Sequence, residues 1–143
     1  MNYLNERNEL VLAALDSVPL DRMRLTKTLF LVWHLNGRKT DFPFPFRPYL
    51  YGPFSNEIYH TLDGLQREGL VAPEPDVDVR WARLYLTAKG EKQVSTLSVD
   101  SDTRQSINTI ARWASEQSFD NVLRYVYSEA PDFATKSIVR DRL

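Results

Sequence analysis

The chain contains 143 residues, with 18 Lys plus Arg against 19 Asp plus Glu, 43% hydrophobic residues and no cysteine. This length and composition predict one soluble globular domain over residues 1–143, large enough to fold without a metal or a disulfide. The lack of cysteine excludes disulfides, thiol catalysis and thiolate zinc sites, and the formal net charge of −1 leaves no excess of cations for non-specific binding to nucleic acid.

No stretch of the sequence approaches the roughly 18 uncharged apolar residues that a membrane span requires, so we expect no association with a membrane. The first residues, Met1 to Asn8, contain no apolar run behind a basic segment, so they give no secretion signal. We therefore expect a cytoplasmic protein.

The first forty residues are typical of two helices. Apolar residues at helical spacing predict one over residues 5–18. Asp21 is a preferred N-cap residue for a second helix, which we expect to end at Asn36. Because Phe30 and Trp33 add apolar bulk beside its main stripe, this second helix should be buried on more than one side at the centre of the core.

Residues 42–54 break this pattern. They contain four of the eight prolines and six of the 17 aromatic residues. Each proline fixes its own φ angle and pushes the residue before it toward extended geometry. We therefore expect a stiff, extended loop with a turn at Gly52-Pro53.

A third helix should follow from an N-cap at Ser55, with an apolar stripe ending at Leu65. Gly69 stands where a left-handed helix end is expected, just before a strand at Leu70-Val71. Residues 72–79, with two prolines and three acids, predict a loop.

Residues 80–86 alternate in polarity and predict a strand with two different faces. The apolar face is formed by Ala82, Leu84 and Leu86, and the opposite face by Trp81, Arg83 and Tyr85. Thr87 is a suitable N-cap for a short helix over residues 88–97.

The last third of the chain predicts further helices after a polar linker at residues 98–102. One helix is expected over residues 103–116. A second should begin at an N-cap at Ser118 and end at Pro131, with Phe119, Val122, Leu123 and Val126 on one face. A short helical piece is expected over residues 135–140.

Three helices, a strand, a loop and a second strand that leads into a helix are the order of a winged helix. We therefore expect a mainly α, α+β fold: a winged-helix-like part over about residues 5–97 with a small β-hairpin wing, and extra C-terminal helices over about residues 103–140.

Several short motifs sharpen this expectation. They are Leu25-Thr26-Lys27, Pro48-Tyr49 followed by Tyr51-Gly52-Pro53-Phe54-Ser55, Leu84-Tyr85-Leu86-Thr87-Ala88-Lys89-Gly90, and Leu123-Arg124-Tyr125-Val126-Tyr127 with Pro131 and Lys136-Ser137. With these motifs the sequence resembles the Panacea domain of SocA-like antitoxins and the related phage-associated proteins of the YwgA type. The likeness covers residues 25–142 with gaps, and the Tyr-Gly-Pro element with its flanking helices is its most specific part.

The resemblance implies a non-enzymatic bacterial or phage protein of a toxin–antitoxin system, which neutralises or masks a partner protein by direct binding. A toxin encoded nearby is the partner it implies. A phage accessory protein that binds a host enzyme is a further possibility that the sequence does not separate from this one.

The aromatic and proline-rich loop is the main candidate for partner binding, because a stiff loop loses little entropy on binding and aromatic side chains supply large contact areas. The candidate residues are Phe42, Phe44, Phe46, Tyr49, Tyr51 and Phe54. The alternative is that these rings form a lid over the core. Of the set, Phe54 and Tyr51 are expected nearer the core, and Phe42 and Phe44 nearer the partner.

The strand face with Trp81 and Arg83 is a second candidate for partner binding. An unpaired strand of this kind could pair with a partner's sheet or with a second copy, which would give a homodimer. Alternatively, Trp81 and Tyr85 cover the helix after Thr87, which is the arrangement we favour.

A DNA-binding regulator is the alternative function. The third helix occupies the place of a recognition helix, and the candidate contacts are Lys27, Asn56, His60, Arg80 and Arg83. Arg22 and Arg24 could extend the same basic patch. The charge of the helix opposes this reading, because its three acids, Glu57, Asp63 and Glu68, outnumber Arg67.

The sequence gives little support for an enzyme. It contains only two histidines, His34 and His60, and no phosphate-binding glycine loop or nucleophile motif. His34 lies in an apolar helix, where a hydrogen-bonded core histidine is the common case. We therefore expect no catalytic residues, no metal site and no cofactor.

Overall fold

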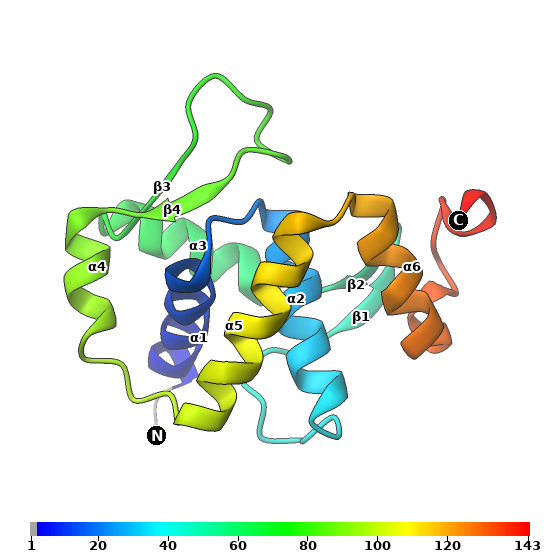
Figure 1. The fold of residues 1–143 in the computed structure, drawn as a ribbon, viewed down its shortest axis with the longest axis horizontal. Helices are drawn as coiled ribbons and strands as arrows, with labels where there is room; N and C mark the ends of the chain where they lie inside the picture. Colours follow the sequence, from blue (N-terminus) through cyan, green and yellow to red (C-terminus); the bar gives the residue numbers. More distant parts are fainter. Residues whose placement is uncertain (1–2) are drawn as a thin grey trace.

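Three helices form the centre of the fold in the computed structural model, which describes residues 3–143, with side chains from residue 5 onward. They are α1 (Tyr3–Ser17), α2 (Arg22–Leu35) and α5 (Ser101–Glu116), and α5 lies across the other two (Figure 1). Every residue of α2 from position 25 to position 32 is buried. The prediction that the second helix forms the centre of the core is confirmed.

The start of α2 is fixed by the predicted cap. The Asp21 carboxylate accepts a hydrogen bond from the Arg24 backbone N–H at 2.8 Å and forms an ion pair with the Arg24 guanidinium at 2.6 Å. The same guanidinium donates to the backbone oxygens of Ala114 and Gln117 at the end of α5. Arg24 therefore links the cap of α2 to the end of α5. Because its guanidinium is engaged in these contacts, Arg24 does not contribute to a basic surface patch.

A hairpin follows α2 where the sequence predicts an extended loop. Strands β1 (Arg47–Tyr49) and β2 (Gly52–Phe54) pair antiparallel, so the turn lies at Leu50-Tyr51 and the predicted turn at Gly52-Pro53 is wrong. Pro48 lies opposite Pro53. Neither proline has an N–H group to donate, so the hydrogen bonds between the strands can be made only by the flanking pairs, Arg47 with Phe54 and Tyr49 with Gly52. A proline-rich segment can form two strands in this register because its prolines face each other.

The wing is built from three segments. Strands β3 (Val71–Pro73) and β4 (Leu84–Leu86) form an antiparallel pair after helix α3 (Asn56–Arg67), and Leu20 adds a single bridge to Leu84. The connection between β3 and β4 extends from the body of the molecule (Figure 1). Helix α4 (Ala88–Val94) follows β4 and begins at the predicted cap, Thr87.

The second strand is shorter than the predicted 80–86. Asp78 holds Arg80 and Trp81 in a turn, because its carboxylate accepts from the Arg80 N–H and its carbonyl accepts from the Trp81 N–H. The predicted faces are nevertheless confirmed. Ala82 and Leu84 are buried, whereas Trp81 and Tyr85 are exposed.

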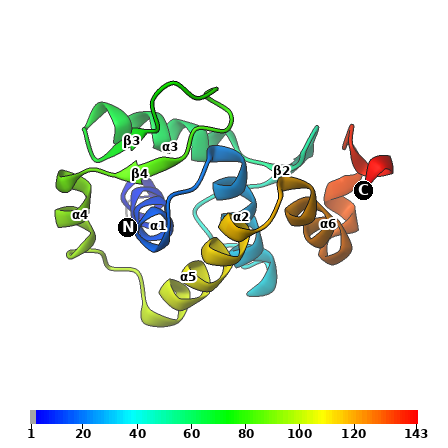
Figure 2. The ribbon, with the colours of Figure 1, turned by 45° about the horizontal axis from the view of Figure 1, so that its top comes forward.

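Helix α6 (Phe119–Glu129) begins at the predicted cap, Ser118, and packs beside α2 and the hairpin (Figure 2). Two short 3₁₀ helices follow, η1 (Pro131–Ala134) and η2 (Arg140–Arg142). The predicted helix at residues 135–140 is wrong, since residues 135–139 connect these two helices and Arg140 is the first residue of η2. The fold is mainly helical with a small β-hairpin wing, as predicted, and it has a second hairpin, β1–β2, which was not predicted. No helix in the described part of the chain is long and apolar enough to cross a bilayer.

Candidate functional site

The phenylalanines at the start of the aromatic segment belong to the core. Phe44 is only 1% exposed, and Phe42 and Phe46 are partly buried against the same cluster. The Arg7 guanidinium donates to the Pro43 carbonyl at 2.8 Å and lies over the Phe44 ring. The prediction that Phe44 faces a partner is therefore wrong, because this contact from α1 turns its ring inward.

The rings near the tip of the hairpin lie at the surface. Tyr49 is 42% exposed and Leu50 is 40% exposed. Tyr51 is partly buried, as expected, and its ring centre lies 6.3 Å from that of Phe119 at the start of α6. Of the predicted partner-binding residues in the proline-rich segment, Tyr49 is thus the exposed one, and Phe42, Phe46 and Tyr51 are partly buried.

The wing reaches the same place from another part of the chain. The Trp81 ring packs edge-on against Phe119 at 5.2 Å and stays 39% exposed. The expectation that Trp81 covers the helix after Thr87 is wrong, since its packing partner is α6. Together, Tyr49, Leu50, Tyr51, Trp81 and Phe119 form what we call the hairpin–wing surface.

Phe119 was not among the predicted site residues, although it was placed on the apolar face of its helix. It is the residue on which Tyr51 and Trp81 meet. Phe119 is the first residue of α6, where the packing of the helix itself can cover only part of the ring. This position is the one sequence signal that could have indicated a role for Phe119 in a surface site.

The predicted DNA-binding residues do not form a basic surface. Lys27 is only 2% exposed, so its assignment to a DNA contact is wrong. Arg80 pairs with Asp78 at 3.3 Å, and Arg83 pairs with Glu74 at 3.0 Å. These hydrogen bonds lower the pKa of both carboxyl groups, so both acids stay ionised and neutralise the two wing arginines.

The outer face of α3 lacks the excess of positive charge that a DNA-recognition helix needs, since Arg67 is its one exposed cation. Asn56 and His60 are exposed, as a base-reading role requires, but Asp63 and Glu68 are exposed beside them. Carboxylates at such positions repel phosphates through the same long-range interaction that ordinarily drives binding to DNA.

Lys27 lies under the hairpin–wing surface. Its Nζ is 5.7 Å from the centre of the Phe119 ring, and none of the ion pairs among the described residues includes it. Burial lowers the pKa of Lys27 to about 7, and the negative charge of Asp21 offsets only part of this effect. The loss of hydration therefore lowers the pKa of Lys27 by more than the attraction of Asp21 and the cation–π contact with Phe119 can raise it.

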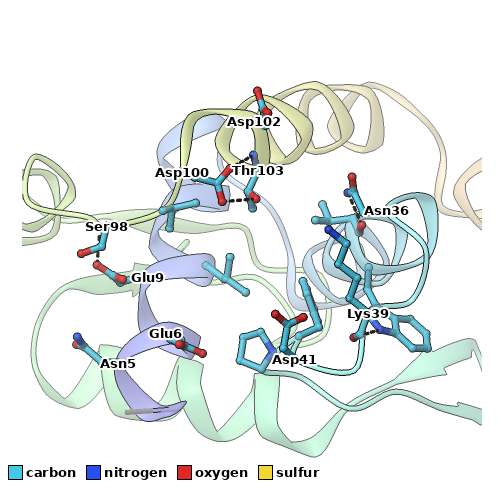
Figure 3. A pocket seen from close by; sticks show the side chains of 16 residues that line it. Asn5, Glu6, Glu9, Asn36, Lys39, Asp41, Ser98, Asp100, Asp102 and Thr103 are labelled. Atoms are coloured by element: carbon cyan, nitrogen blue, oxygen red, sulfur yellow. Dashed lines mark hydrogen bonds between the residues drawn. The ribbon is translucent and has the colours of Figure 1, made fainter. Parts of the chain in front are cut away.

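A cavity of about 640 Å³ opens on another side of the molecule, between α1, the end of α2 and the start of α5 (Figure 3). Five acids and one lysine contribute to its lining: Glu6, Glu9, Asp41, Asp100, Asp102 and Lys39. Two of the carboxylates have structural partners, because Glu9 accepts from the Ser98 N–H and Asp100 caps α5 through Thr103. Figure 3 shows these two contacts at the rim between α1 and α5.

The histidines do not form a site with other ligating groups. Among the described residues, no group of three or more His, Asp or Glu side chains has the geometry to hold a metal ion. His34 is half-buried and hydrogen-bonded rather than part of the core: it accepts from the Arg38 guanidinium at 3.0 Å, stacks on Phe30 and lies 3.4 Å from Glu129.

No model of a known protein family matches the chain, and a search of curated proteins finds no similar sequence. The resemblance to Panacea proteins therefore depends on the motifs quoted above. Among these, Tyr51-Gly52-Pro53-Phe54-Ser55 coincides with the hairpin tip, β2 and the cap of α3.

Proposed function

We propose that this chain is an antitoxin-like binding protein that masks a partner protein, such as a toxin encoded nearby, by covering part of its surface. The observation that carries this proposal is the hairpin–wing surface, where rings from the hairpin and the wing meet on α6 and stay partly exposed. The likeness of the same hairpin to the Tyr-Gly-Pro element of Panacea antitoxins also supports it.

The rings of this surface are held before any partner arrives. Tyr51 and Trp81 both pack on Phe119, and the hairpin between Pro48 and Pro53 is stiff. Pre-positioned aromatic side chains lose little entropy on association and are typical hot spots of protein interfaces. A stable complex covers about 800 Å² on each partner, roughly a tenth of the 7765 Å² that this chain exposes.

Regulation of transcription by DNA binding is the less supported function. It requires a continuous basic strip, whereas Lys27 is buried and Arg80 and Arg83 are neutralised by Asp78 and Glu74. Retardation of promoter DNA that weakens steeply as salt rises would favour this alternative over the masking proposal.

The masking proposal is tested with a partner captured from the native host, identified by mass spectrometry, and purified. Tyr49→Ser and Trp81→Ser should each weaken its binding about tenfold or more while the circular-dichroism spectrum at 25 °C stays that of the native fold. Tyr125→Ser is the matched control, since Tyr125 is 37% exposed but lies on α6 against Trp113.

Co-expression gives the functional readout. The native chain should suppress the toxicity of the partner, and the Trp81→Ser chain should do so poorly. Equal affinity of the native, Tyr49→Ser and Trp81→Ser chains for the partner would remove the hairpin–wing surface from the mechanism. Turnover of a substrate by the purified chain would contradict masking as the mode of action.

A further inference from the structure

A row of stacked side chains continues from the hairpin onto α3 and α2. The Arg47 guanidinium lies 5.3 Å from the Phe54 ring centre, Phe54 lies 5.2 Å from Tyr59, and Tyr59 lies 5.5 Å from the Arg22 guanidinium. Tyr49 packs beside Phe54 at 5.2 Å. We call these five residues the arginine–aromatic strip.

The strip crosses three elements that are adjacent in space. Strand β2 leads directly into α3, and the Tyr59 hydroxyl reaches Met23 in the first turn of α2. In Figure 2 the β2–α3 connection passes beside the start of α2. The strip and the hairpin–wing surface are both carried by the β1–β2 hairpin, the strip through Arg47, Tyr49 and Phe54 and the surface through Tyr51.

The two arginines at the ends of the strip have no counter-charge in the described part of the chain. None of its ion pairs includes Arg22 or Arg47. Arg47 is exposed, and the buried Nε of Arg22 has no hydrogen-bond acceptor. Since this Nε is closed to solvent, a partner's carboxylate can pair with Arg22 only through its other guanidinium nitrogens, whereas it can pair directly with the exposed Arg47.

The carboxylates nearest in sequence to the strip are already engaged. Asp21 is 3% exposed and pairs with Arg24, and Glu57 accepts from the Ser55 hydroxyl. The strip therefore presents rings with a positive charge at each end, and among the described residues no acid forms an ion pair with either arginine.

We propose that the arginine–aromatic strip binds an acidic segment of the partner protein, with one carboxylate at Arg47, another at Arg22 and an apolar or aromatic side chain on the rings between them. This inference rests on the proposed masking function and specifies its partner. Planar guanidinium groups match carboxylates in bidentate geometry, and rings beneath them favour an apolar contact. The three steps along the strip span at most the length of about five extended residues.

A protein segment fits the surroundings better than nucleic acid. Stacked rings with arginines can also hold single-stranded bases. A nucleic-acid strand, however, continues beyond the strip, and the neighbouring face of α3 exposes Asp63 and Glu68. These carboxylates repel a run of phosphates, whereas a short acidic segment of a folded partner can end before it reaches them.

The test uses a short synthetic peptide, acetyl-Glu-Asp-Phe-Pro-Asp-Glu-amide, and NMR of the ¹⁵N-labelled full chain. At millimolar concentration the peptide should shift the amide signals of β1, β2 and the first turn of α3, together with the Nε–Hε signals of Arg22 and Arg47. The uncharged peptide with Gln and Asn in place of Glu and Asp should shift none of them.

Single variants separate specific pairing from general charge. Arg47→Gln and Arg22→Gln should each weaken binding of the acidic peptide roughly tenfold, and the double variant should abolish it. Arg67→Gln is the matched control, because Arg67 is exposed, likewise outside the described ion pairs, and at the far end of α3. It should bind the peptide as the native chain does.

Three results would overturn the inference. The first is the absence of shifts along the strip with the acidic peptide. The second is an equal loss of binding in Arg67→Gln, which would mean unspecific attraction. The third is a response of the strip to oligothymidylate but not to the peptide, which would assign it to nucleic acid.

The purified partner separates this inference from the masking proposal. If Trp81→Ser loses the partner while the Arg22→Gln, Arg47→Gln double variant keeps it, masking stands and the acidic segment is refuted. If neither loses it, both fail. If both lose it, an acidic segment in the interface is supported.

Discussion

The buried Lys27 makes the stability of this chain depend on pH in a defined direction. Its pKa falls from 10.5 to about 7 on folding because burial removes water from the ammonium group. The unfolded chain therefore holds this proton more tightly than the folded chain between these two pH values. Over this window the contribution of Lys27 to stability rises with pH, and below about pH 7 its full penalty is present.

Lys27→Met removes the charge and keeps an unbranched side chain of similar length. A shift from 10.5 to about 7 corresponds to a penalty on the order of 5 kcal/mol for the charged form. The variant should thus be several kcal/mol more stable than the native chain near pH 6, and this advantage should shrink by about the same amount as pH rises above 10.

Urea unfolding followed by tryptophan fluorescence measures this difference at several pH values, because urea is uncharged and leaves electrostatics intact. Subtracting the variant from the native chain cancels the other titrating groups. Lys92→Met is the control for removing a lysine charge, since Lys92 is exposed on α4. A Lys27→Met difference that is constant from about pH 6 to about pH 10 would refute the reasoning.

Two matched pairs test the packing. Gly90→Ala should destabilise by roughly 1–3 kcal/mol in urea unfolding, because the new Cβ would lie 2.1 Å from the Leu70 carbonyl oxygen. Gly64→Ala, with only a flexible arginine tip within 4 Å, should instead stabilise by up to about 1 kcal/mol. Phe44→Ala should cost about 3–5 kcal/mol, and Tyr49→Ala less than about 1 kcal/mol; equal losses would contradict the assignment of Phe44 to the core and Tyr49 to the surface.

Local signals in the sequence predicted several helix ends, although the predicted cap Ser55 makes no side-chain hydrogen bond to α3 and α5 begins inside the predicted linker. Asp21 and Thr87 cap their helices with side-chain hydrogen bonds, and Gly69 has the expected left-handed backbone with φ of +74°. Such features depend on residues within one turn, so the sequence alone contains the information they need.

The aromatic segment shows where local reasoning fails. Phe44 and Tyr49 belong to the same proline-rich stretch, yet one ring is buried and the other is exposed. The difference comes from distant contacts: Arg7 lies over Phe44, and Phe30 and Trp33 pack on Phe46. A periodicity of two predicts alternating faces, but it does not indicate which face meets the core.

Lys27 could have been placed correctly from the sequence. Its helix carries apolar or small neutral residues on both sides of it from Leu25 to Val32, and a helix buried on more than one side leaves no solvent face at that position. The prediction that Lys27 contacts DNA relied on lysine being a charged residue and neglected the apolar pattern of the helix around it. The pattern was the stronger evidence.

The position of Phe119 connects this buried charge with the exposed rings. One contact of the ring is the Lys27 ammonium, and others are Tyr51 and Trp81. A wing that carries its own tryptophan onto α6 is held through the β3–β4 connection as well as at its strands, so the hairpin and the wing keep a fixed relation. This is the property a masking surface requires, because two segments far apart in sequence can act as one rigid site only if a third element fixes both.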